Sequence, residues 1–161
     1  MISPLGRSAD DAEDTPVTVR LLQLPLKLWQ RATEHHDELM REMALLALSD
    51  TKPELPHRLL ELVEVLGLRY GASVAHPDAE RDAAMARGLD RADITYLVPR
   101  SAAASAQRIQ ALLDEVEAYC RTHLLTLAQS PAQTDFGQWY IDQFVRQCAG
   151  HPPTPWPGPW S

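Results

Sequence analysis

The feature that most constrains the fold is the segment 26–48, in which apolar side chains recur with the period of an α-helix. Apolar positions three or four residues apart fall on one face of a helix, and the charged positions of this segment fall on the opposite face. The apolar face contains Leu28, Ala32, His35, Leu39, Met43 and Leu46, with His36 beside them. Pro25 suits the start of a helix, and residues 49–53 break the pattern. We therefore predict one long amphipathic helix that carries two histidines on its apolar side.

The same patterns predict the remaining elements. Apolar stripes indicate helices at 54–70, at 77–89, from Ser101 to about 129, and at 132–148, whereas alternation favours strands at 17–24 and 94–99. Gly71 occupies the position of a helix-ending glycine, and Pro77 suits the first turn of the weaker second segment. Because an isolated two-stranded ribbon is marginal in water, the strands should pair and lie on the helices. The prediction is a mainly α fold with four principal helices, one minor helix and a small two-stranded ribbon.

The ends of the chain differ in composition from its centre. Residues 1–15 are polar and acidic, which predicts a disordered leader, and we expect residues 16–150 to form a single helical domain. Residues 151–161 are rich in proline, which predicts an extended tail carrying Trp156 and Trp160. The tail can dock on its own domain, on a second copy of the chain or on another protein, and the sequence leaves these alternatives open.

Composition and charge argue against several functional classes. A formal net charge of −7 disfavours binding to nucleic-acid phosphates and to anionic membranes. Two cysteines are too few for a disulfide framework, and no apolar run is long enough to cross a bilayer. Residues 1–15 lack the basic and apolar regions of a signal peptide. We therefore expect a cytoplasmic protein that binds neither nucleic acid nor membrane.

The histidine pair at 35 and 36, flanked by acids, is the sharpest chemical feature. The two residues are adjacent on the helix and project about 100° apart, whereas metal ligands on one helix favour spacings of three or four residues. Glu38 has that spacing from His35 but points to the polar side. A divalent metal site would therefore need His123 from the helix after Ser101. The alternatives are packed rings with hydrogen-bonded nitrogens and a pair that senses pH.

Catalytic motifs are missing from the sequence. No serine lies in a Gly-x-Ser-x-Gly frame, and the seven glycines form neither a dinucleotide-binding nor a phosphate-binding loop. Cys120 and His123 are three residues apart on one helix, and a histidine can lower the pKa of a thiol. Both lie on the predicted core face, where a nucleophile would not meet a substrate. We therefore expect neither an enzyme nor a cofactor, apart from the divalent metal considered above.

Several strings together resemble a known family. They are VRLLQLP at 19–25, EHHDELMRE at 34–42, LLDEVEAYCR at 112–121, LLTLA at 124–128, WY at 139–140, FVRQ at 144–147 and PPTPW at 152–156. They resemble small actinobacterial helical proteins, which are similar to neighbours of the anti-sigma-factor ATP-binding proteins, STAS proteins and phosphatases of partner-switching systems. The resemblance implies a regulatory accessory protein and supplies no catalytic residues. The chain also lacks the nucleotide-binding glycines of the kinase-like members.

The sequence therefore favours a non-enzymatic regulator that binds another protein, such as an ATP-binding anti-sigma factor. Partner-binding candidates are the tryptophans Trp29, Trp156 and Trp160. The second hypothesis is a helical protein that binds a metal or a small ligand through His35, His36 and His123. The third is a structural homodimer.

Overall fold

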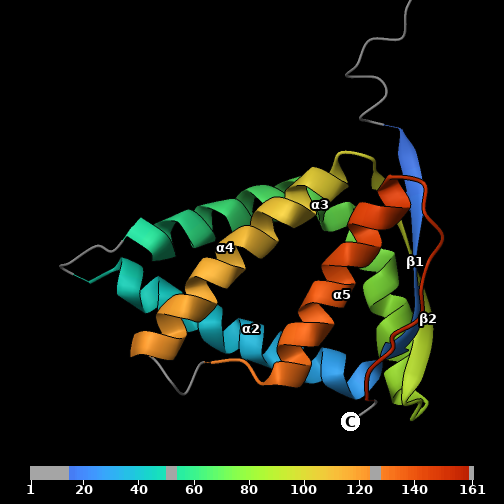
Figure 1. The fold of residues 1–161 in the computed structure, drawn as a ribbon, viewed down its shortest axis with the longest axis horizontal. Coiled ribbons are helices and arrows are strands. Elements are labelled where there is room, and N and C mark those ends of the chain that lie inside the picture. Colours follow the sequence, from blue (N-terminus) through green and yellow to red (C-terminus); the bar gives the residue numbers. More distant parts are fainter. Residues whose placement is uncertain (1–14, 50–53, 124–127, 160–161) are drawn as a thin grey trace, which may run out of the picture.

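Two strands and four helices make up the part of the chain that the structure describes, which is residues 15–49, 54–123 and 128–159 (Figure 1). In this computed structural model they are β1 (Pro16–Pro25), α2 (Leu26–Ala47), α3 (Glu54–Ala86), β2 (Arg91–Pro99), α4 (Ala102–His123) and α5 (Pro131–Cys148). The order confirms the predicted mainly α fold with its ribbon. The predicted leader, up to residue 14, and Trp160 lie outside the described residues, as do the side chains of 66–74 and 123.

The two strands pair antiparallel, as predicted, and their pairing runs from Pro16 opposite Pro99 to Pro25 opposite Arg91. A bulge interrupts the register between Leu21 and Leu24. Within it, Gln23 has a φ of 57°, and its backbone N–H donates to the Asp93 carboxylate over 2.8 Å. This bond supports a left-handed conformation that is uncommon for a residue other than glycine.

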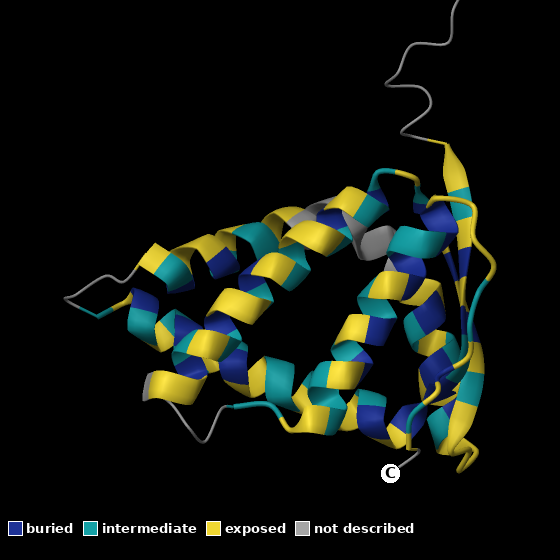
Figure 2. Cartoon of the chain, viewed as in Figure 1, coloured by how far each residue is buried: buried dark blue, intermediate teal, exposed yellow. Residues whose placement is uncertain are grey.

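One face of the ribbon packs on the helices and forms the larger of two apolar clusters. Alternate residues of both strands are buried there: Val19, Leu21, Ile94, Tyr96 and Val98. Aromatic residues of α5 complete this cluster. The second cluster joins α2, α3 and α4 through Leu39, Met43, Leu59, Leu112, Val116 and Cys120. Figure 2 shows the resulting bands of buried and exposed positions along the helices.

Helix α3 differs from the prediction of two helices separated at Gly71. The helix runs from Glu54 to Ala86 and contains Pro77 in its interior. A single glycine costs a helix only about 1 kcal/mol relative to alanine, so it does not by itself end one. Proline removes a backbone hydrogen bond and bends a helix without necessarily ending it. Figure 1 shows α3 changing direction along its length, so the two predicted segments are the arms of one bent helix.

Helix α5 begins with a capping box at Ser130. The Ser130 hydroxyl accepts from the Gln133 backbone N–H, and the Gln133 side chain accepts from the Ser130 N–H. Pro131 at the first helical position has no N–H to satisfy. The helix therefore starts one residue before the predicted Ala132, and its buried residues include Phe136, Trp139 and Phe144.

The tail packs on its own domain as far as Pro159. The Trp156 side chain is 5% exposed and meets the rings of Phe136 and Trp139 edge-on, at 5.8 and 5.5 Å between centroids. Its indole N–H donates to the Pro159 carbonyl over 2.8 Å. A Cβ at Gly158 would collide with the Trp156 ring, so the turn that follows the tryptophan requires glycine.

The tail and α5 also cover the outer edge of β1. The Gln147 side chain accepts from the Arg20 backbone N–H over 2.8 Å and donates to the Arg20 carbonyl over 2.9 Å. Further along, the Trp156 backbone N–H donates to the Leu22 carbonyl over 3.2 Å. The Gln143 side chain also holds the tail, because it accepts a hydrogen bond from the Thr154 backbone N–H and donates one to the Thr154 hydroxyl.

Candidate functional site

A cavity of about 300 Å³ lies between α2, α4 and α5, on the side of α2 that carries the histidine pair. We call it the interhelical cavity. Helix α2 contributes Trp29, Ala32, Thr33 and the two histidines, and α4 contributes Ile109 and Leu113. Helix α5 contributes Phe136, Gly137, Tyr140 and Ile141. Figure 1 shows that α4 and α5 move apart as they approach α2. Its volume is at the lower end of the range for small-molecule pockets, and its wall is mainly apolar.

His35 and His36 both line the interhelical cavity and both are half-buried. A position near the middle of the apolar stripe predicts deep burial of His36, and its half-buried ring differs from that prediction. Adjacent helical positions project about 100° apart, and both residues still border the cavity. The His35 Nε2 atom is buried and has no hydrogen-bond partner within the described residues. A packed ring with its other nitrogen hydrogen-bonded stays an alternative for His35.

Burial lowers the pKa of His36 below its ordinary value of 6.5; the Asp37 carboxylate opposes this effect and His35 adds to it. His36 is therefore neutral at pH 7, which is the state that binds a metal. Among the described residues, no three histidine, cysteine or acidic side chains are placed to hold a metal ion. The His123 side chain lies outside the described part, so a metal site of three histidines stays a prediction. Glu38 is exposed, as predicted.

Most other polar groups in the cavity wall bond to the protein itself. The Gln133 side chain donates to the Arg31 carbonyl in addition to its capping bond. Gln110 donates to the Asp114 carboxylate over 2.7 Å, and the Thr33 hydroxyl donates to the Trp29 carbonyl over 3.0 Å. These side chains shape the wall and are already engaged. The histidines and Tyr140 are the groups to consider for contact with a ligand.

The inner wall of the cavity rests on a buried polar cluster around Arg81, which is 4% exposed. Its guanidinium lies 3.6 Å from the Trp29 ring centroid, donates to the Tyr96 hydroxyl over 3.1 Å and pairs with Asp78. The Tyr96 and Tyr140 hydroxyls are 2.9 Å apart. Trp29, a predicted partner-binding residue, thus lies between the cavity and this arginine.

Burial, together with the neighbouring Tyr96, holds the pKa of Tyr140 well above 10, so its hydroxyl keeps its proton. Sequence reasoning missed Arg81 and Tyr96 as members of a site. The spacing of three residues from Asp78 to Arg81 was the one local signal, and it is equally typical of a solvated helix surface.

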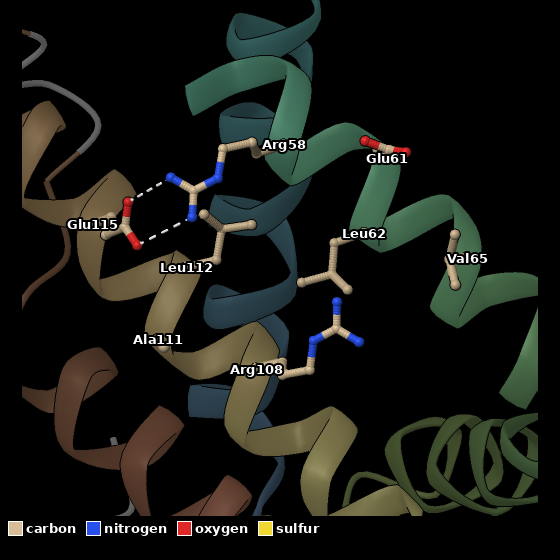
Figure 3. A pocket seen from close by; sticks show the side chains of 8 residues that line it. All are labelled: Arg58, Glu61, Leu62, Val65, Arg108, Ala111, Leu112 and Glu115. Atoms are coloured by element: carbon tan, nitrogen blue, oxygen red, sulfur yellow. Dashed lines mark hydrogen bonds and ion pairs between the residues drawn. The ribbon is translucent and has the colours of Figure 1, made fainter. Parts of the chain in front are cut away.

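A second depression lies between α3 and α4 and has a volume of about 440 Å³ (Figure 3). Charged side chains from both helices surround it, and Arg58 spans the two helices to bond Glu115 over 3.0 Å. Both partners of this pair are about half exposed. Exposed ion pairs of this kind contribute little and are common on helical surfaces. We therefore take the interhelical cavity as the candidate site.

Cys120 has no exposed surface, and burial, with a smaller effect of Glu117, raises the pKa of its thiol. A protonated thiol without access to solvent does not act as a nucleophile. The burial of Cys120 confirms its predicted place on the core face.

Comparison with protein-family models, with curated proteins and with solved structures finds no match for this chain. The relation to partner-switching proteins therefore stays a prediction from the sequence strings. Of the helices in the described ranges, none has both the length and the apolar character that a membrane span requires.

Proposed function

We propose that this chain is a binding protein that takes a small, mainly apolar molecule into the interhelical cavity. The observation that carries the proposal is a cavity of about 300 Å³ between three helices, whose mainly apolar wall includes two half-buried histidines. Pockets for small molecules have this composition, in which a few polar atoms orient a ligand held by apolar contacts.

The regulatory protein predicted from the sequence ranks second. Two of the tryptophans on which it depends, Trp156 and Trp29, are engaged within the chain itself. A ligand-binding domain and a regulator are compatible functions, because occupancy of the cavity would stabilise one arrangement of α2, α4 and α5. The homodimer and the anti-sigma-factor partner stay predictions.

Titration with the neutral fluorescent probe N-phenyl-1-naphthylamine tests the proposal. We expect saturable fluorescence enhancement with one site per chain. Gly137→Leu should abolish it, because Gly137 lines the cavity and a Cβ there meets no atom within 4 Å, which leaves room for the new side chain. The matched control is Ala118→Leu, which adds a similar side chain on an exposed position of α4. Equal probe binding by both variants, or no saturable binding by the parent, would overturn the proposal.

A further inference from the structure

The depression between α3 and α4 is built from one stripe of each helix (Figure 3), and we call it the α3–α4 groove. Its lining residues recur at intervals of three and four along both helices, so each set lies on one helical face. They are Arg58, Glu61, Leu62 and Val65 on α3, and Arg108, Ala111, Leu112 and Glu115 on α4. The interhelical cavity uses other residues of α4, namely Ile109, Gln110 and Leu113, so the two features are separate.

The charges around the α3–α4 groove are balanced. Two arginines and two glutamates line it, although the whole chain carries a formal net charge of −7. Arg58 and Glu115 satisfy each other through two bonds, over 3.0 and 3.4 Å. Arg108 and Glu61 form no hydrogen bond or ion pair with any residue that the structure describes. One cation on α4 and one anion on α3 are therefore left without a partner there.

Apolar side chains reach the surface between these two charges. Val65 is 52% exposed, and Leu62 is half-buried and lies between Glu61 and Arg108 in Figure 3. Single exposed apolar residues are common and need no partner. An apolar floor with charged groups around it, however, has the arrangement of a protein–protein interface, in which an apolar centre is surrounded by a polar rim.

This surface is complementary to itself. In a dimer with a two-fold axis, every contact between two different residues occurs twice. An unpaired cation on α4 and an unpaired anion on α3 can therefore satisfy each other in both directions. A uniformly acidic or basic partner would instead place one of these groups opposite a like charge. The charges elsewhere on the chain oppose association little, because physiological salt screens them beyond about 8 Å.

We propose that two copies of this chain associate through the α3–α4 groove, with Arg108 of each copy paired with Glu61 of the partner subunit and Val65 packed on the apolar floor. Helix α4 has 22 residues and is about 33 Å long, and two adjacent helices are about 20 Å wide. Their outer face provides about 650 Å² per copy, which is near the lower limit for a specific interface. The dimer should therefore dissociate in the micromolar range.

Sedimentation equilibrium of the full-length chain, from about 1 to 500 μM, tests this surface. The average mass should rise from that of one chain towards that of two. Arg108→Glu and Glu61→Arg should each raise the dissociation constant about tenfold, because each reversal turns two attractive pairs into two repulsive ones. The double variant rebuilds both pairs with exchanged signs and keeps the net charge of the parent, so its dissociation constant should return to within about threefold of the parent value.

Arg87→Glu is the matched control, because it changes the net charge as Arg108→Glu does, at an exposed position outside the groove. It should leave the dissociation constant within about twofold of the parent value. Equal weakening by both variants would show a general charge effect and refute the proposed contact.

The other outcomes are equally decisive. A parent chain that stays monomeric up to about 500 μM refutes the dimer, and this result does not depend on the folding of any variant. A dimer that neither single reversal weakens has its interface elsewhere. A double variant as weak as the single variants shows that Arg108 and Glu61 do not meet. Each of these results leaves the proposed ligand binding standing, because N-phenyl-1-naphthylamine reports on the interhelical cavity alone.

Discussion

Replacing Trp156 with alanine should destabilise the whole domain, because the tail supplies part of the larger apolar cluster. The indole is 5% exposed and contacts two aromatic rings of α5 at less than 6 Å between centroids. Truncation of a buried tryptophan to alanine typically costs about 3–5 kcal/mol. In a chain of this length each kcal/mol lowers Tm by about 2–4 °C, so we expect a decrease of roughly 10 °C.

Urea denaturation followed by far-ultraviolet circular dichroism measures this loss in the full-length chain. Trp156→Phe is the matched control, because it keeps one aromatic ring and removes the five-membered ring with its N–H bond to Pro159. It should lose less than half as much free energy of unfolding as Trp156→Ala. If Trp156→Ala unfolds within about 1 kcal/mol of the parent, the tail adds little to the fold and the reasoning from burial is wrong.

Two further predictions concern the cavity wall. Gly137→Ala should stabilise the fold by about 0.5–1 kcal/mol, because alanine favours the interior of α5 and its Cβ meets no atom within 4 Å; a lower urea midpoint would contradict this. His36 has a lowered pKa when folded, so the unfolded chain binds more protons below pH 6.5 and stability decreases as pH falls through that value. Between pH 7.5 and 5 the parent should therefore lose more stability than His36→Gln in matched urea titrations, and parallel pH profiles would argue against burial of the ring.

Local patterns in the sequence predict most of the secondary structure. The period of α2 and the alternation in β1 and β2 depend on which residues face the core, so these elements follow from side-chain spacing alone. The length of helix α3 does not follow from local patterns. Gly71 and Pro77 are local signals for a helix end, whereas the continuity of the helix through them depends on its packing in the folded domain. A sequence gives the position of a bend more reliably than it gives the choice between a bend and a break.

The candidate site is less predictable for a geometric reason. A helical projection places His35 and His36 toward the interior, and both do line the cavity. The cavity itself depends on the separation of α4 and α5, which cannot be predicted from the sequence of either helix alone. The approach of Arg81 to Tyr96 and Tyr140 joins three elements distant in sequence, so no short motif marks it.

The bonds between Gln147 and Arg20 determine how the ribbon can grow. The N–H and C=O groups of Arg20 bond to Gln147 and therefore both point away from β2. In an antiparallel ladder the N–H and C=O groups of the opposite residue, Thr95, then point away from β1. The side-chain amide of Gln147 takes the place of the peptide group that a neighbouring strand would supply. The tail covers the next part of the same edge, where the Trp156 N–H bonds to the Leu22 carbonyl. Strand addition at β1 is therefore blocked by the chain's own α5 and tail. A third strand, from this chain or another, would have to pair with the free edge of β2, so the sheet can be extended on that side alone.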